Sequence, residues 1–217
     1  MPVVEFASWP IAEGVDWRTI LRPSLVALRQ AKGFIEYFVG VPAEDSQRLQ
    51  FSVAWDAIED HRALQKSAIY PEMCEAIKAC LPAGTEITSL TSYHFDFGVH
   101  ARTEEEKNFI PALSAPFTEW LFLTLKEGKT KEDLVPLLDI SIRDNFTADA
   151  KRIKGMHTPP VWAQSVEDPK VFAALFGWDT VAVHTEVAAQ DKYGPIIRDV
   201  KEVVDMTVTH TPFERNI

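Results

Sequence analysis

A histidine beside a carboxylate is the combination in this sequence that could do chemistry. His94 and Asp96 stand two residues apart in the segment "SYHFDF". In an extended strand, alternate side chains share a face, so these two would point the same way, about 7 Å apart. A histidine can act as a general base when a carboxylate orients its ring. We therefore predict that His94 and Asp96 form a catalytic pair, although a purely structural pair would look the same in the sequence.

The alternation of the same strand predicts where a pocket would lie. Tyr93, Phe95 and Phe97 form an apolar face suited to packing against helices, so His94 should face an inner cavity. The first half should carry the chemistry, because His210 in the corresponding strand of the second half has no carboxylate beside it. Glu5 and Glu119, on the first predicted strand of each half, could instead be surface charges. The predicted substrate-binding residues are Glu5, Trp9, Tyr37, Glu119, Trp120 and Trp162.

One sequence element occurs twice. The segments "WDAIEDHRALQKSAIY" and "WDTVAVHTEVAAQDKY" both read W-D-x-[I/V]-x-x-H, with a tyrosine nine residues after the histidine, and they begin 123 residues apart. His61 and His184 occupy the same position on apolar helix stripes in the two copies. A position shared by both copies favours a structural role, such as packing under the tryptophan, over a role in one active site. The chain is therefore predicted to hold two copies of one small α+β unit.

The elements around these segments follow the same order in both halves. Apolar periodicity and turn residues predict a strand, a helix, two strands, one or two helices and a final strand in each half. The predicted domains are a first repeat over 1–97, a linker over 98–115 and a second repeat over 116–217. Sheets with helices on one face would be antiparallel, which gives an α+β fold class.

The repeated element carries a family resemblance. The segment "WDAIEDHRALQKS" resembles the helix start of the dimeric α+β barrel superfamily, most closely the antibiotic-biosynthesis-monooxygenase (ABM) type, and "WDTVAVHTEVAAQ" resembles it more loosely. The resemblance implies two ferredoxin-like repeats that form a pseudo-dimeric α+β barrel within one chain. It also implies a cofactor-independent enzyme that acts on a small aromatic or polyketide-like molecule, by monooxygenation or by cyclisation or dehydration. A non-catalytic ligand-binding or stress-response barrel is the alternative.

Cofactor signals are weak throughout the sequence. Some members of the resembled superfamily bind haem, but the haem-degrading ones place a histidine about ten residues after the tryptophan, where this chain has Gln65 and Ala188. Haem is therefore disfavoured. Neither a G-x-G-x-x-G motif nor a P-loop occurs, and no H-x-x-x-H spacing indicates a metal. We expect neither a cofactor nor a metal.

Composition limits the partners. Asp and Glu outnumber Lys and Arg by 32 to 22, and no basic cluster occurs, which argues against nucleic acid and anionic membranes. No stretch approaches 18 apolar residues and no signal peptide is seen, so a cytoplasmic protein is expected. Cys74 and Cys80, six residues apart on one predicted helix, suit free thiols. The expected partner is a small hydrophobic or aromatic molecule, and a homodimer is left open.

Overall fold

The computed structural model describes residues 3–87, 90–100, 110–149 and 153–216, which divide into two compact units. The first unit runs to His94 and also includes the C-terminal residues from Glu214. The second unit comprises Phe95–Phe213. Residues 101–109 of the predicted linker lie outside the described residues, so the predicted linker boundaries stay a prediction.

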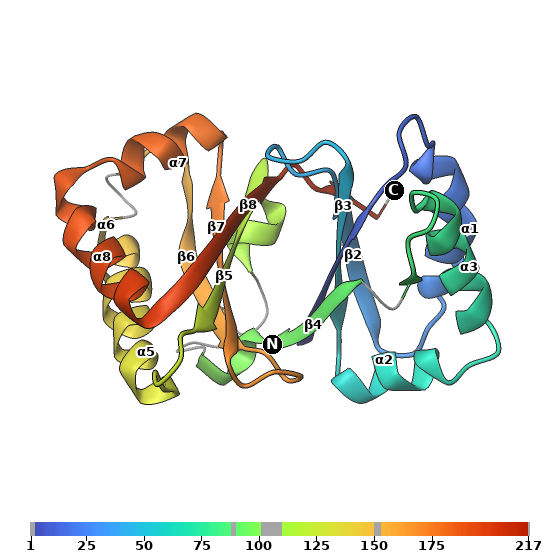
Figure 1. Ribbon diagram of the computed structural model, residues 1–217, viewed down its shortest axis with the longest axis horizontal. Helices are drawn as coiled ribbons and strands as arrows, with labels where there is room; N and C mark the ends of the chain where they lie inside the picture. The colour runs from blue at the N-terminus through green and yellow to red at the C-terminus, as the bar shows by residue number, and fades with distance from the viewer. Residues whose placement is uncertain (1–2, 88–89, 101–109, 150–152, 217) are drawn as a thin grey trace. The chain divides into compact units, whose positions relative to one another are not determined.

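The first unit is a sheet with helices on one face (Figure 1). Its strand order is β4-β1-β3-β2-β9, and β3 pairs antiparallel with both β1 and β2. The order of the first four strands is that of a ferredoxin-like unit. The strands are β1 (Val3–Pro10), β2 (Phe34–Gly40), β3 (Arg48–Trp55), β4 (Thr91–Asp96) and β9 (Glu214–Arg215), and the helices are α1 (Trp17–Leu28), α2 (Ile58–Gln65) and α3 (Tyr70–Cys80).

The second unit repeats this arrangement. Its strand order is β6-β7-β5-β8, in which β5 pairs antiparallel with β7 and β8, and its helices again cover one face (Figure 1). The prediction of two ferredoxin-like repeats with antiparallel sheets is confirmed. The strands are β5 (Phe117–Leu125), β6 (Met156–Gln164), β7 (Val171–Trp178) and β8 (Val204–Thr211), and the helical segments are α5 (Lys131–Leu137), the π-helical η4 (Leu138–Asp144), α6 (Asn145–Asp149), α7 (Val181–Ala188) and α8 (Gly194–Val203).

The side of each sheet that faces the helices carries a hydrophobic core. In the first unit, Trp17, Leu21, Leu25 and Leu28 recur at helical spacing and are the buried residues of α1, so one stripe of that helix meets the sheet. The Asp16 side chain accepts a hydrogen bond from the backbone N–H of Thr19 and caps the helix start. The second unit builds an equivalent core around Leu123, Leu134, Phe172, Trp178 and Val200.

The W-D positions make the same backbone contact in both units. The backbone N–H of Asp56 donates to the carbonyl of Gly33, and that of Asp179 donates to the carbonyl of Gly155, both at 2.7 Å. Both glycines have a positive φ, 71° and 88°, a conformation that favours glycine. Asp56 does not cap α2, although its type and the glutamate three residues later would suit a capping box, because the N-cap residue is Ala57, which has no side-chain cap.

The C-terminal strand joins the first unit. Residues 214–217 were predicted to belong to the second repeat, but β9 pairs with β2, with Glu214 opposite Val39 and Arg215 opposite Phe38. Asn216 extends this contact, since its backbone N–H donates to the Tyr37 carbonyl and its side-chain oxygen accepts from the Tyr37 N–H, both at 3.1 Å. Among the residues that the structure describes, no helix combines the length and the apolar character needed to cross a membrane.

Candidate functional site

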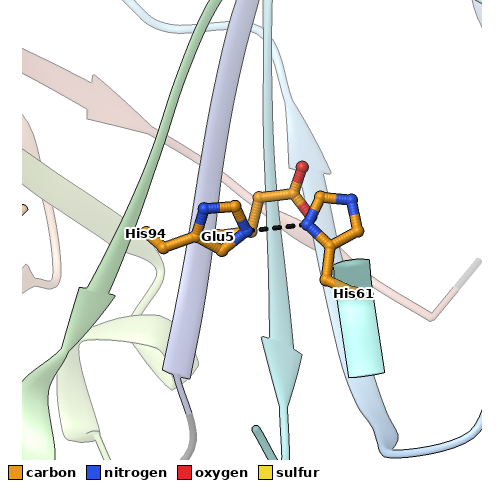
Figure 2. A group of neighbouring side chains, drawn as sticks. All are labelled: Glu5, His61 and His94. Atoms are coloured by element: carbon orange, nitrogen blue, oxygen red, sulfur yellow. Dashed lines mark hydrogen bonds and ion pairs between the residues drawn. The ribbon is translucent and has the colours of Figure 1, made fainter. Parts of the chain in front are cut away.

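The first unit brings two histidines and a carboxylate together. The Nδ1 atom of His61 lies 2.7 Å from the Nε2 atom of His94 and 3.4 Å from the Oε2 atom of Glu5. Figure 2 shows the three side chains, which come from β1, α2 and β4, pointing toward one another. The indole N–H of Trp55, at the end of β3, donates to the same Glu5 oxygen at 3.2 Å. We call Glu5, His61 and His94 the first cluster.

The second unit contains the same arrangement. The Nδ1 atom of His184 lies 2.6 Å from the Nε2 atom of His210, and the Oε2 atom of Glu119 lies 3.5 Å and 3.7 Å from these nitrogens, respectively. The Trp178 indole N–H donates to the Glu119 oxygen at 2.6 Å. We call Glu119, His184 and His210 the second cluster. They come from β5, α7 and β8, the counterparts of β1, α2 and β4.

The two clusters explain why W-D-x-[I/V]-x-x-H is repeated. Trp55 stacks on His61 with ring centroids 5.1 Å apart, and Trp178 stacks on His184 at the same distance. The predicted packing of each histidine on its tryptophan is confirmed. The grouping of these residues was not predicted, although the sequence carries a signal for it: Glu119 follows Glu5 by 114 residues and His210 follows His94 by 116, a few residues short of the 123-residue offset of the repeated element.

The predicted direction of His94 is wrong. His94 contacts His61 on α2 and therefore faces the helices, whereas Phe95 points to the opposite face and contacts Trp120 and Phe122. The alternation along the strand is correct but its faces are exchanged, because a carboxylate and a second histidine on the helix side provide the partners that a buried imidazole needs. The Asp96 side chain instead bonds to the backbone at the end of the strand, where its Oδ1 atom accepts a hydrogen bond from the N–H of Gly98 at 2.9 Å.

The predicted substrate-binding residues are distributed over several places. Trp9 and Tyr37 belong to the core of the first unit, where the Tyr37 hydroxyl accepts from Arg29 at 3.1 Å. Trp162 belongs to the core of the second unit, and its indole N–H donates to Asp139 at 3.2 Å. Trp120 lies among Phe95, Phe97 and Phe122. Glu5 and Glu119 are cluster members rather than surface charges.

A cavity of about 290 Å³ in the second unit adjoins the second cluster. It lies between the sheet and the helices α6, α7 and α8, on the face opposite to the one predicted for the pocket. Glu119 and His184 form a polar end, and the rest of the wall is largely apolar. Its aromatic wall includes Phe146 and Tyr193, whose rings stack 4.7 Å apart, together with Phe176 and Trp178. A largely apolar wall with a few convergent polar groups is typical of a small-molecule site.

The tyrosines that end the repeated element lie close to the clusters. In the first unit, burial raises the pKa of the Tyr70 phenol, and the nearby Cys74 and Glu5 add to the effect. Tyr70 therefore remains protonated at neutral pH. Its counterpart Tyr193 is buried and lines the cavity. The prediction that the first half carries the chemistry thus meets a contrary observation, because a cavity adjoins the reactive groups of the second unit.

Comparisons with known proteins identify the fold. No family model matches the sequence. No curated protein matches it either. An anthrone oxidase-like protein of known structure is similar over 99% of this chain and 92% of its own, with a TM-score of 0.69 and 11% identity.

Two candidate monooxygenases of known structure are also similar. The protein from Fusobacterium nucleatum has a TM-score of 0.65 and 8% identity over 98% of this chain and 92% of its own. The protein from Lactobacillus acidophilus has a TM-score of 0.60 and 10% identity over 100% of this chain and 94% of its own. At these identities the likeness concerns the fold. The chain therefore shares its fold with these three structures, and the predicted tandem of two ferredoxin-like repeats is confirmed at the level of the fold.

Proposed function

We propose that the second unit binds a small aromatic molecule in its cavity and that the second cluster removes a proton from it, as the first step of a cofactor-independent monooxygenation. The observation that carries this proposal is the position of Glu119 and His184 at one end of an otherwise apolar cavity. An apolar wall favours an aromatic ligand, and the polar end can act on one acidic group of that ligand.

His184 is the member of the cluster that a ligand can reach. Its side chain is 22% exposed, whereas those of Glu119 and His210 are 4% and 5% exposed. Trp178 fixes the ring plane by stacking, and His210 contacts the Nδ1 atom. The proton would be taken at the ring nitrogen opposite Nδ1. The buried carboxylate of Glu119 would then stabilise the positive charge that the histidine pair gains.

The rest of the reaction needs no cofactor if the substrate supplies the electrons. Loss of a proton from an acidic C–H group gives an electron-rich carbanion that can reduce O₂. The overall balance is R₂CH₂ + O₂ → R₂C=O + H₂O, in which the carbon loses four electrons and O₂ gains them. The fold shared with an anthrone oxidase-like protein supports a tricyclic or similar aromatic substrate of this kind. Cyclisation or dehydration would use the same proton removal without O₂.

A second candidate function is ligand binding without catalysis. The observation in its favour is that the same glutamate, tryptophan and two histidines occur in the first unit, where they could serve the fold alone. Under this alternative, the second cluster would only hold α7 against the sheet, and the cavity would bind a hydrophobic molecule unchanged.

The two functions can be separated with anthrone as the probe. We expect the purified, chelator-treated protein to accelerate O₂ uptake by anthrone, with a ketone product seen by mass spectrometry. His184→Gln should lower kcat by about 10²- to 10⁴-fold, the usual contribution of a general base, while anthrone affinity changes little. The matched control is His61→Gln in the first cluster, which should retain turnover. Equal activity in wild type and His184→Gln would favour the binding protein, and product formation without O₂ uptake would favour cyclisation or dehydration.

A further inference from the structure

The first cluster has a feature that the proposed reaction does not use. One nitrogen of His61, one nitrogen of His94 and one carboxylate oxygen of Glu5 all lie within 4.8 Å of one another. The three atoms belong to three different elements and point toward a common centre (Figure 2). We propose that Glu5, His61 and His94 bind one divalent transition-metal ion.

The donor set suits such an ion. Imidazole nitrogens favour zinc, iron, copper and nickel, and two histidines with one carboxylate are a common ligand combination for divalent metals. Metal–ligand distances of about 2.0–2.2 Å place neighbouring ligand atoms about 3.3–3.6 Å apart in a tetrahedral site and about 2.8–3.1 Å apart where the ligands meet at right angles. The observed separations are 2.7 Å between the two nitrogens and 3.4 Å between His61 and Glu5. The Glu5 oxygen lies within 4.8 Å of the His94 nitrogen, so side-chain movements alone could bring the three atoms to metal-binding separations.

The ion would replace a proton. Without metal, a separation of 2.7 Å between two ring nitrogens is that of a hydrogen bond, in which one imidazole donates to the other. An ion at the same centre would instead receive a lone pair from each nitrogen and one from the carboxylate, and the imidazole that had donated would carry its proton on its other ring nitrogen. It would also neutralise the Glu5 carboxylate, whose side chain is only 12% exposed and which costs free energy to bury without a cationic partner.

The surroundings of the first cluster orient its ligands. The Trp55 indole N–H holds the Glu5 oxygen at 3.2 Å, and the same indole stacks on the His61 ring. Groups that fix a ligand in this way are typical neighbours of metal sites. His61 and His94 are both buried, and with three protein ligands the ion would keep one further coordination position open. The ion would tie α2 to β1 and β4, independently of the reaction proposed for the second unit.

The chain supplies its own comparison. The second cluster has the same donors, at 2.6, 3.5 and 3.7 Å from one another, and differs in that His184 opens onto the cavity. The same substitution can therefore be made in either cluster, so that the ions bound to each cluster can be counted separately.

The test titrates the chelator-stripped full chain with Zn²⁺ or Co²⁺ alone, counting bound ions by elemental analysis and recording the visible Co²⁺ absorption. We expect Glu5→Gln and His61→Gln to lose one bound ion per chain relative to wild type, and Glu119→Gln and His184→Gln to retain that ion. Trp55→Phe should weaken it by about 10- to 100-fold, as loss of a ligand-orienting group does, whereas Trp178→Phe should not.

The proposal is overturned if the wild type takes up neither ion, or if Glu5→Gln binds as tightly as wild type. Glu5→Gln keeps the size and shape of the side chain, so it decides the matter even if the histidine variants fail to fold. Loss of a second bound ion in Glu119→Gln would also support two histidines and a glutamate as metal ligands. That result would count against the metal-free proton transfer proposed for the second cluster, but the metal site proposed for the first cluster would stand.

Discussion

The Nδ1 atom of His184 lies 2.6 Å from the Nε2 atom of His210, and the equivalent atoms of His61 and His94 lie 2.7 Å apart. In each unit this pair joins a helix (α2 or α7) to a strand (β4 or β8). A glutamate from the first strand of the unit (β1 or β5) lies beside the pair. The duplicated W-D motif thus supplies the tryptophan and one histidine of a four-residue arrangement. The glutamate and the second histidine come from two other strands of the unit.

Replacing the buried Glu119 should cost stability. Glu119→Gln keeps the shape of the side chain but turns the charge-assisted bond from Trp178 into a neutral one. We expect the free energy of unfolding to fall by about 1–2 kcal/mol, measured by urea denaturation. Glu127→Gln, at an exposed position, is the control and should stay within about 0.5 kcal/mol of wild type. A Glu119→Gln protein as stable as the control would show that the charge contributes nothing.

Filling the cavity should block ligand binding without disturbing the second cluster. Ala188 lines the cavity, and Ala188→Phe would place a ring in it, whereas Ala189 is exposed and Ala189→Phe serves as the control. We expect at least a ten-fold loss of affinity for anthrone or a fluorescent apolar dye in the first variant only. Equal affinities in both variants would place the ligand elsewhere.

The two cysteines should react at very different rates. Burial raises the pKa of the Cys80 thiol to about 11, so at pH 8 only about one molecule in a thousand carries the thiolate. Cys74 is partly exposed on the same helix. Mass spectrometry after brief iodoacetamide treatment should find Cys74 modified and Cys80 unmodified. Modification of Cys80 in folded Cys74→Ser protein at a comparable rate would show that the helix opens readily.

The start of α5 should make a small contribution to acid sensitivity. The Thr130 backbone and side chain donate hydrogen bonds to the Asp133 carboxylate and lower its pKa. A carboxyl whose pKa is lower in the folded state adds stability above its unfolded pKa of about 4 and loses it as the pH falls. Melting temperatures from pH 6 to pH 3 should therefore fall slightly more for wild type than for Asp133→Asn. Parallel curves would refute this contribution.

Local patterns predicted the elements well because each depends on near neighbours. The spacing of Trp17, Leu21, Leu25 and Leu28 defines the buried face of α1, and the repeat offset predicts the second unit.

The site was harder to predict because alternation gives two faces without saying which one meets the helices. Tyr93, Phe95 and Phe97 suggested helix packing, but Phe95 contacts Trp120 and Phe122 instead. Likewise, closeness in sequence gave the wrong carboxylate, Asp96, as the partner of His94. The carboxylate beside that ring is Glu5, 89 positions earlier, and only the pairing of β1 and β4 in the sheet brings it close.

Removing the residues after Phe213 should destabilise the first unit. The truncation deletes β9, the hydrogen bonds of Asn216 with Tyr37, and the ion pairs of Arg18 with Glu214 and of Glu36 with Arg215. We expect a loss of about 1–3 kcal/mol and faster hydrogen exchange at the amide of Tyr37. The amides of β7 in the second unit, such as that of Ala174, are the internal control. Unchanged exchange at Tyr37 would mean that β9 adds nothing to the edge of β2.

The place of β9 has a consequence during translation. The ribosome makes β2 long before β9, so a nascent first unit carries a sheet edge whose backbone groups at Phe38 and Val39 await a partner while the whole second unit is being synthesised. Exposed edges recruit strands from other chains. Slow elongation through the second unit should therefore favour co-aggregation of nascent chains, and a chaperone that covers this edge would raise the yield of folded protein.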